Sequence, residues 1–278
     1  MLAFEEWAVR LSQLCDNIDR LVLSETERLH TLGQQRPQTR ETWADIAISL
    51  AWLGRTTQLL KSVRLLALHG LGTSAAVVAR SMWETWIDAA WLYRDRDERS
   101  TDLWTSNDVQ NLAFISSFER WDGYLTESYE VARQEILQSI TQTPKLYQKW
   151  MKEGQPKSFH AIKWANHTYA ERCKVMGNLY QRSYDIEYAL LSSIAHGDAM
   201  GLSEQMQDLG NGQTVITPGA GRVKAMERLL LANSFALMLA YEIQHGYVGG
   251  HTAEVENLKT QVAHLRREYD DLVPYQAF

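Results

Sequence analysis

The chain has 278 residues, of which 45% are hydrophobic and 22% are charged, a composition typical of a folded globular protein and not of a disordered one. Its formal net charge of -6 argues against broad, sequence-independent nucleic-acid binding, which depends on an excess of Lys and Arg. Cys15 and Cys173 lie far apart without a CxxC spacing, which excludes a disulfide scaffold and a zinc knuckle and favours two reduced, buried thiols.

The N-terminal sequence MLAFEEWAVRLSQL carries acidic residues where a secretory signal has basic ones. No uninterrupted apolar run approaches the length that a membrane-spanning helix requires. We therefore expect a soluble, cytoplasmic protein with no membrane partner.

Helical periodicity dominates the first half of the chain. Apolar residues spaced three and four apart predict a first helix over 4–29 and a second over 41–69. The sequence HGLGTS at 69–74 predicts a tight turn, with Gly70 and Gly72 available for positive φ and Ser74 as the N-cap of a third helix. The charge run RDRDER is expected to be the solvated end of that helix, and further helices are expected from about 106 to 123 and from 126 to 140.

The second half begins after GQPKS at 154–158, a short linker that could divide one helical domain, 1–278, into lobes 1–153 and 159–278. The segment 159–196 is expected to be helical with a break near Gly177, and the loop that follows predicts a small hairpin or lid near 207–219. Two final helices are predicted over 222–244 and 253–272. The fold class is therefore all-α, a bundle of roughly seven to nine helices.

The two terminal helices, 4–29 and 253–272, share an apolar seam that repeats every three or four residues. About two and a half heptads are short for an independent coiled coil, which favours packing on the bundle or on each other. A homodimer formed through these seams is the alternative.

Two sets of polar residues repeat every four positions within apolar sequence. Each set falls on one helical face: Arg80, Glu84 and Asp88 in the third helix, and Tyr188, Ser192 and His196 in the helix that ends before Gly197. An uncompensated charge among apolar side chains is costly, so these groups must be paired or used. We expect the two faces to meet.

Arg80 is the first candidate for chemistry. Glu84, four residues later, could hold the guanidinium so that its planar fork remains available to an anion such as phosphate. An ion pair that fixes the register of two helices is the structural alternative. Trp83 beside it, with Trp86 and Trp91, can either fill the core or stack on a base.

His196 is the second candidate. A helix C-terminus favours the imidazolium form, and Asp198 would favour it further, which suits a general acid or a phosphate ligand. Alternatively, His196 caps the last carbonyls of its helix. Ser192, four residues before His196, does not form a hydrolase triad without a third orienting group.

The sequence predicts neither a metal nor another cofactor. It contains no HExxH, no ExxH pair and no cysteine cluster of the kind that binds metals. The glycine-rich stretch LGNGQTVITPGAG lacks the lysine and the strand-to-helix context of a phosphate-binding loop.

The pair of motifs, VVARSMWETWIDAAWLYRD and then YDIEYALLSSIAHGD, resembles an uncharacterised, all-helical bacterial domain family of unknown function. Its members carry R-x-x-x-E on one helix and Y-x-x-x-S-x-x-x-H on another, and the resemblance spans about 60–205. It implies a role for the matching positions, which are Arg80, Glu84, Tyr188, Ser192 and His196.

The second motif is also distantly similar to the helix of HEPN-type domains, whose ribonuclease members use an Arg and a His separated by four to six residues. Here those positions hold Leu190, Leu191 and Ser192, and the nearest preceding arginine is Arg182. A ribonuclease of this type would need Arg80, from another helix, in place of the missing arginine.

The leading hypothesis is a polar pocket that binds a small anion, a nucleotide or RNA. As an enzyme it would cleave a phosphodiester without a metal, with Arg80 stabilising the developing charge, Glu84 orienting Arg80 and His196 acting as acid or base. Such a role resembles that of helical toxin and phage-defence proteins. The ligand-binding candidates are Tyr188, Ser192, Asp88, Trp83 and Asp198. The alternative is a non-catalytic interaction module in which both polar faces form one buried network.

Overall fold

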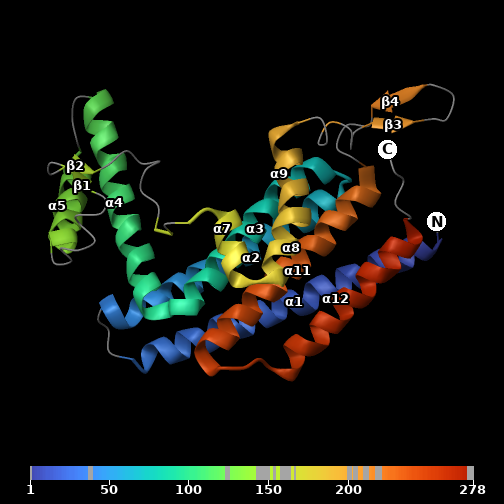
Figure 1. The fold of residues 1–278 in the computed structure, drawn as a ribbon, viewed down its shortest axis with the longest axis horizontal. Helices are drawn as coiled ribbons and strands as arrows, with labels where there is room; N and C mark the ends of the chain where they lie inside the picture. Colours follow the sequence, from blue (N-terminus) through green and yellow to red (C-terminus); the bar gives the residue numbers. More distant parts are fainter. Residues whose placement is uncertain are drawn as a thin grey trace. The chain divides into compact units, whose positions relative to one another are not determined.

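The computed structural model describes residues 2–36, 40–122, 126–141, 151–152, 155–156, 164–165, 167–198, 202, 206–208, 213–216 and 221–273. These residues fold into helices and two short hairpins, so the all-α class predicted from the sequence is confirmed (Figure 1). The long helices are α1 (Leu2–Gln34), α2 (Arg40–Leu68), α3 (Gly72–Leu92), α4 (Arg96–Asp122), α5 (Glu127–Thr141), α11 (Gly221–Val248) and α12 (Ala253–Leu272). The shorter helical elements are η1 (Tyr93–Asp95), α7 (Tyr169–Met176), α8 (Asn178–Ser183), η3 (Tyr184–Tyr188) and α9 (Ala189–His196). The antiparallel strand pairs are β1 (Met151–Lys152) with β2 (Gln155–Pro156), and β3 (Met206–Asp208) with β4 (Thr214–Ile216).

The chain divides into two compact units. The first combines Met1–Pro37, Ser49–Arg94 and Tyr169–Phe278, and the second combines Gln38–Ile48 with Asp95–Thr168. The first unit therefore contains both polar faces singled out in the sequence.

The centre of the first unit is the pair of helices α3 and α11, which pack along each other. Buried residues lie on every side of α11, among them Leu230, Phe235 and Ala240, so this helix has no solvent-facing side along most of its length. Helices α1 and α12 cover it. This core holds α3 in place and leaves another of its faces to α7 and α9.

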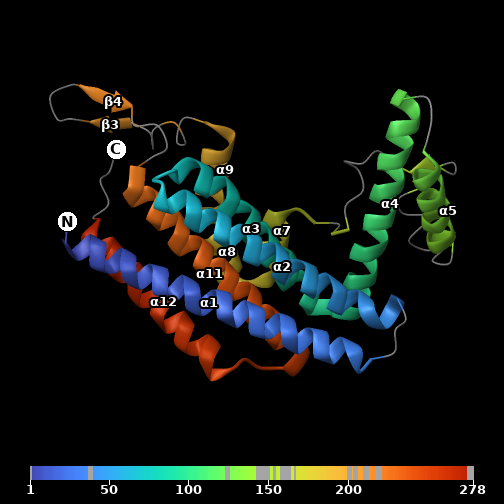
Figure 2. The ribbon, with the colours of Figure 1, turned by 180° about the vertical axis from the view of Figure 1, so that it is seen from behind.

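The terminal helices α1 and α12 pack together within one chain, and Figure 2 shows them side by side. The indole nitrogen of buried Trp7 donates to the carbonyl oxygen of Leu265 at 2.9 Å, and its ring lies 5.2 Å from that of Tyr269. An ion pair of 2.8 Å joins Arg10 to Glu268 at the rim. The apolar seams seen in the sequence therefore serve this intramolecular contact.

The turn between α2 and α3 is formed around Gly70, which has the positive φ of 69° that the sequence suggested, whereas Gly72, expected to share this conformation, is the first residue of α3. Helix α3 begins at Gly72, and its N-cap, Leu71, makes no side-chain capping bond. The prediction that Ser74 caps this helix is therefore wrong, because the helix begins two residues earlier.

The segment from α7 to α9 is a run of short helices separated by two irregularities. Gly177, with a φ of 112°, separates α7 from α8, at the predicted break. The second irregularity is the π-helical turn η3, which the apolar periodicity did not indicate. The part of 159–196 that precedes α7 lies largely outside the described residues.

The second unit has a small core of its own between α4, α5 and β1, formed by Val109, Leu112, Ala113, Ile140 and Met151. Helix α4 begins at Arg96, ten residues before the predicted cap at Ser106. Asp97 and Glu98 in its first turn complement the positive helix N-terminus, so the charge run starts a helix as well as following one.

The predicted hairpin near 207–219 is present as β3 and β4, while residues 209–212 and 217–220 lie outside the described part of the chain. Of the linker at 154–158, only Gln155 and Pro156 are described, as β2. Within the described residues, no helix combines the length and the apolarity that crossing a membrane requires.

Candidate functional site

Arg80 and His196 meet on the first unit although 116 positions separate them in the sequence. Arg80 lies in the middle of α3 and His196 is the last residue of α9, and Nη1 of Arg80 lies 3.1 Å from Nε2 of His196. The packing of α9 against α3 creates this contact. The two polar faces expected to converge do converge at these residues.

The guanidinium of Arg80 is held in three directions. Its Nε donates to Oε1 of Glu84 at 3.1 Å, one turn along α3. Its Nη2 donates to the hydroxyl of Tyr188 at 3.2 Å, and its Cζ lies 5.2 Å from the centre of the Tyr188 ring. Partial burial opposes the charge, but Tyr188 and Glu84 outweigh it and raise the pKa of Arg80 above its ordinary value. These contacts hold the charged guanidinium of Arg80 in one orientation.

The site is open to solvent at its edge. The side chain of Arg80 is 21% exposed and that of Glu84 is 28% exposed, and His196 is an exposed residue. A sealed network would bury all three groups. Arg80 and Glu84 are therefore partly accessible to solvent.

The contact with Arg80 also shows which ring nitrogen of His196 faces the cation. An arginine has only donors, so Nε2 of His196 is the acceptor in this contact. An imidazole nitrogen of His196 therefore points toward Arg80.

The end of α9 is closed by the backbone and not by the histidine. Gly197 adopts the left-handed conformation, with φ 64° and ψ 33°, and donates to the carbonyl of Ile194 at 3.2 Å. The amide of Asp198 donates to the carbonyl of Ser193 at 3.3 Å, and the hydroxyl of Ser193 donates to the Asp198 carboxylate. Because the carbonyls have these partners, the imidazole of His196 is available to Arg80.

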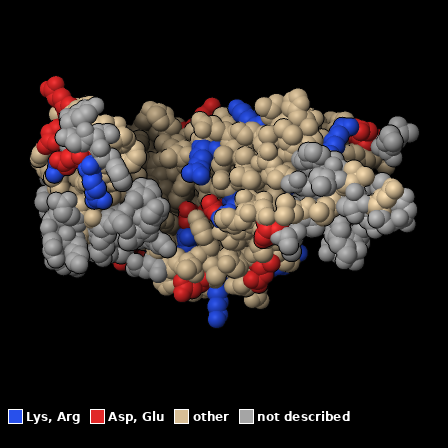
Figure 3. Space-filling view, turned by 90° about the horizontal axis from the view of Figure 1, so that it is seen from above, with Lys and Arg blue, Asp and Glu red and all other residues tan. Residues whose placement is uncertain are grey.

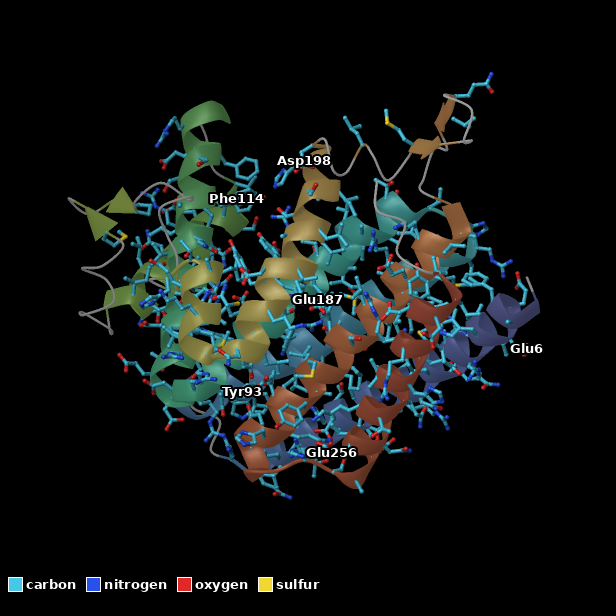
Figure 4. The ribbon with its side chains drawn as sticks, turned by 45° about the vertical axis from the view of Figure 1, so that its right-hand side comes forward. Glu6, Tyr93, Phe114, Glu187, Asp198 and Glu256 are labelled. Atoms are coloured by element: carbon cyan, nitrogen blue, oxygen red, sulfur yellow. The ribbon has the colours of Figure 1, made fainter. Side chains whose placement is uncertain are left out.

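The sequence predicted that Asp198 lies beside His196 and favours its charged form. In the structure the Asp198 carboxylate accepts a hydrogen bond from the hydroxyl of Ser193. Figure 4 labels Asp198 beyond the end of α9 and Glu187 in η3, so the two acidic residues lie at opposite ends of this segment. Ser192 lies one turn before His196 and is partly exposed. It stays a candidate for contact with a ligand.

Tyr188 belongs to a group of aromatic rings built around the π-helical turn. Its ring stacks on that of Tyr184, with centroids 5.3 Å apart and planes 18° apart. On its inner side it packs against Trp83 at 4.4 Å. The hydroxyl that contacts Arg80 is therefore carried by a ring that its neighbours hold firmly.

Trp83 does not have the ligand-binding role that the sequence suggested. It is fully buried, and its indole nitrogen donates to the hydroxyl of Ser183 at 2.8 Å. No base can reach a ring with no exposed surface, so Trp83 supports Tyr188 from below. Trp86 and Trp91 are buried as well.

Asp88, the third member of the first polar face, serves a different contact from Arg80. Its carboxylate pairs with Nη1 of Arg172 in α7 at 2.5 Å and accepts from the hydroxyl of Tyr169 at 3.4 Å. Burial raises the pKa of Asp88, and the nearby Arg172 only partly offsets this effect. Asp88 therefore joins α3 to α7 and is not placed as a ligand contact.

Arg172 and Tyr169 were not found by sequence reasoning. Arg172 is buried, with a side chain that is 5% exposed, and its guanidinium lies 4.2 Å from the centre of the Tyr169 ring. Their spacing of three residues, one turn of a helix, was the available signal, and it is common in helices of all kinds. The pairing of these residues with Asp88 becomes visible only in the packing of α7 on α3.

Charged residues on the face in Figure 3 are scattered among uncharged ones, and the described residues there form no broad basic surface. Within the described part of the chain, no group of three or more His, Cys, Asp or Glu is placed to hold a metal ion. Any anion at this site would therefore depend on Arg80 and its immediate neighbours.

Comparison with known proteins gives one result. A model of a family of unknown function (DUF5677) matches residues 46–214, which is more than half of the chain and includes every residue of the Arg80 site. No curated protein and no solved structure matches the chain.

Proposed function

The chain belongs to DUF5677, a family of unknown function, and from the geometry of its site we propose that it binds a phosphate group of RNA and cleaves the adjacent bond without a metal ion. One observation carries the proposal: Nη1 of Arg80 lies 3.1 Å from Nε2 of an exposed histidine. A fixed cation and a titratable acid or base are thereby within reach of one phosphate.

Binding would replace contacts that Arg80 makes within the protein with contacts to phosphate oxygens. Glu84 fixes Nε of Arg80, so the two Nη groups face Tyr188 and His196 and can be redirected to phosphate oxygens.

The chemical step uses His196 as the base. Its Nε2 accepts the proton of a ribose 2′-hydroxyl, and the 2′-oxygen then forms a bond to phosphorus. The bond from phosphorus to the 5′-oxygen breaks, and that oxygen takes a proton from water. Arg80 stabilises the extra negative charge of the five-coordinate transition state. The products are a 2′,3′-cyclic phosphate and a 5′-hydroxyl.

RNA is the substrate that suits this set of groups. The site contains a cation and an acid or base but offers no side chain that is activated as a nucleophile, since Ser192 lacks the orienting partners of a triad. RNA carries its own nucleophile in the 2′-hydroxyl. A DNA strand lacks that group and would bind without reacting.

A second candidate is a non-catalytic interaction module. All three nitrogens of Arg80 already contact protein groups, and a network that fixes the register of α3 and α9 would need the same contacts. The two functions differ in what Arg80 contributes: a register network requires it for stability, whereas a phosphate site requires it for binding.

The test is incubation of the protein with a single-stranded RNA in the presence of EDTA. We expect cleavage with 2′,3′-cyclic phosphate ends, and a loss of about 100-fold or more in rate for His196→Ala and for Arg80→Ala. His264→Ala is the matched control, because His264 is an exposed histidine of α12. The DNA strand of the same sequence should remain intact.

Equal rates for the wild type and the His196→Ala and Arg80→Ala variants would remove the nuclease function. Absence of cleavage together with absence of phosphate binding would remove the phosphate site as well and favour the interaction module.

A further inference from the structure

Tyr184 and Tyr188 present a stacked pair of rings beside the Arg80 cation. Their centroids are 5.3 Å apart, their planes differ by 18°, and both residues are partly exposed. The guanidinium of Arg80 lies 5.2 Å from the ring of Tyr188. The ring of Tyr188 therefore contacts both the ring of Tyr184 and the cation of the candidate phosphate site.

The stacking depends on the π-helical turn η3, which covers Tyr184 to Tyr188. A π-helix has a wider turn than an α-helix, so side chains four residues apart lie more nearly above one another and their rings can become parallel. π-helical turns inside helices occur often at functional sites. This turn gives Tyr184 and Tyr188 their shared orientation.

The other rings of the group are occupied by protein contacts. Trp83 is fully buried, and the ring of Tyr169 is covered by the Arg172 guanidinium at 4.2 Å. Tyr188 already has Arg80 near its ring. Tyr184 contacts the rings of Trp83 at 6.1 Å and Tyr188 at 5.3 Å, but among the three partly exposed rings it is the one with no guanidinium among its described contacts, so it is the best placed to receive a flat group from solvent.

We propose that the occupant of the Arg80 site is a nucleotide with an unpaired base, and that this base stacks on Tyr184 while the phosphate lies between Arg80 and His196. The inference rests on the proposed function for the position of the phosphate. Stacking on an aromatic ring accepts any base, because every base has a flat π-face. Single-stranded RNA offers such bases, whereas the bases of a duplex are stacked inside it.

The experiment compares two ligands on the intact protein by calorimetric titration: inorganic phosphate and adenosine 5′-monophosphate. We expect the nucleotide to bind about tenfold more tightly than phosphate, since stacking of one base contributes that much or more. Tyr184→Leu should reduce nucleotide affinity to that of phosphate and leave phosphate affinity unchanged. Tyr184→Phe should retain the full difference, because it keeps the ring.

Tyr129→Leu is the matched control. Tyr129 is also a partly exposed tyrosine in a stacked pair, with Phe118 at 5.4 Å and 19°, and it lies in the second unit. Its replacement should alter neither affinity. Circular dichroism of each variant reports whether the helices are intact.

The two proposals fail in different ways. Wild-type protein that binds phosphate but binds the nucleotide no more tightly would overturn the stacking role and leave the phosphate site standing, and this comparison needs no variant. An equal loss of both ligands in Tyr184→Leu would also overturn it. Failure of the wild type to bind either ligand would contradict the phosphate site itself.

Discussion

Arg80 and Asp88 lie two turns apart on the same face of α3, yet their surroundings differ. Arg80 pairs with Glu84 and contacts an exposed histidine, and both members of that ion pair are more than one fifth exposed. The side chain of Asp88 is 22% exposed, but it pairs with Arg172, whose side chain is only 5% exposed, and with a tyrosine of α7. One helical repeat therefore supplies an open cation at one end and a structural ion pair at the other.

The difference shows what a regular spacing can and cannot mean. The four-residue repeat only states that the side chains share a face. Which part of that face is covered depends on α7 and α9, which come from sequence about a hundred residues later. The comparison predicts that charge removal will affect stability at the Asp88 end and ligand binding at the Arg80 end.

The largest effect is expected for Arg172→Met. The change leaves the carboxylate of Asp88, whose side chain is 22% exposed, without its cation and a charged hydrogen-bond donor, which should destabilise the fold by about 2–3 kcal/mol. Urea unfolding at pH 7.5 measures this loss. A loss below about 1 kcal/mol would place the pair among ordinary surface ion pairs and would end the contrast with Arg80.

The same variant should show a stability that depends on pH. The pKa of Asp88 is raised in the folded protein, and removal of Arg172 raises it further, since Arg172 is the group that lowers it. A carboxyl with a raised folded pKa contributes stability at low pH that is lost as the pH rises through that pKa. Unfolding at pH 4.5 should therefore show a smaller difference from the wild type than unfolding at pH 7.5, and a constant difference would contradict this assignment.

A smaller effect is expected for Trp83→Phe, which changes the support beneath the Arg80 end. The substitution removes the hydrogen bond to Ser183 and leaves a small cavity below Tyr188. We expect a loss of about 1–2 kcal/mol in unfolding free energy. Phosphate affinity should also fall severalfold, because Tyr188 becomes less fixed. Unchanged phosphate affinity in a folded variant would show that the Tyr188 hydroxyl plays no part in binding.

The smallest effect on stability is expected for Arg80→Met. The ion pair with Glu84 is partly exposed, and such pairs contribute about 0–1 kcal/mol. The variant should therefore unfold at nearly the same urea concentration as the wild type while it loses phosphate binding. A loss comparable to that of Arg172→Met would identify the Arg80 contacts as a structural network and favour the interaction module.

The sequence was sufficient for the fold class, the helical elements of the first unit and the pairing of Arg80 with Glu84, since these depend on periodicity and on neighbours one turn apart. It also indicated that Arg80 and His196 belong together. It did not reveal the pairing of Asp88 with Arg172, because the three-residue spacing of Tyr169 and Arg172 is common in helices of all kinds and did not single these residues out. The π-helical turn at Tyr184 was missed for a related reason: one extra residue in a turn changes the geometry without changing the residue pattern.

The central claim is that Arg80 and His196 form one phosphate site. Its most direct measurement is the ¹⁵N NMR signal of the His196 imidazole during a titration with inorganic phosphate near pH 7. The His196 signal should move as phosphate binds, because the anion takes the place of the contact between Nη1 of Arg80 and Nε2 of His196, and the movement should be absent in Arg80→Met. An imidazole signal that phosphate does not move, or that moves equally in Arg80→Met, would contradict the claim.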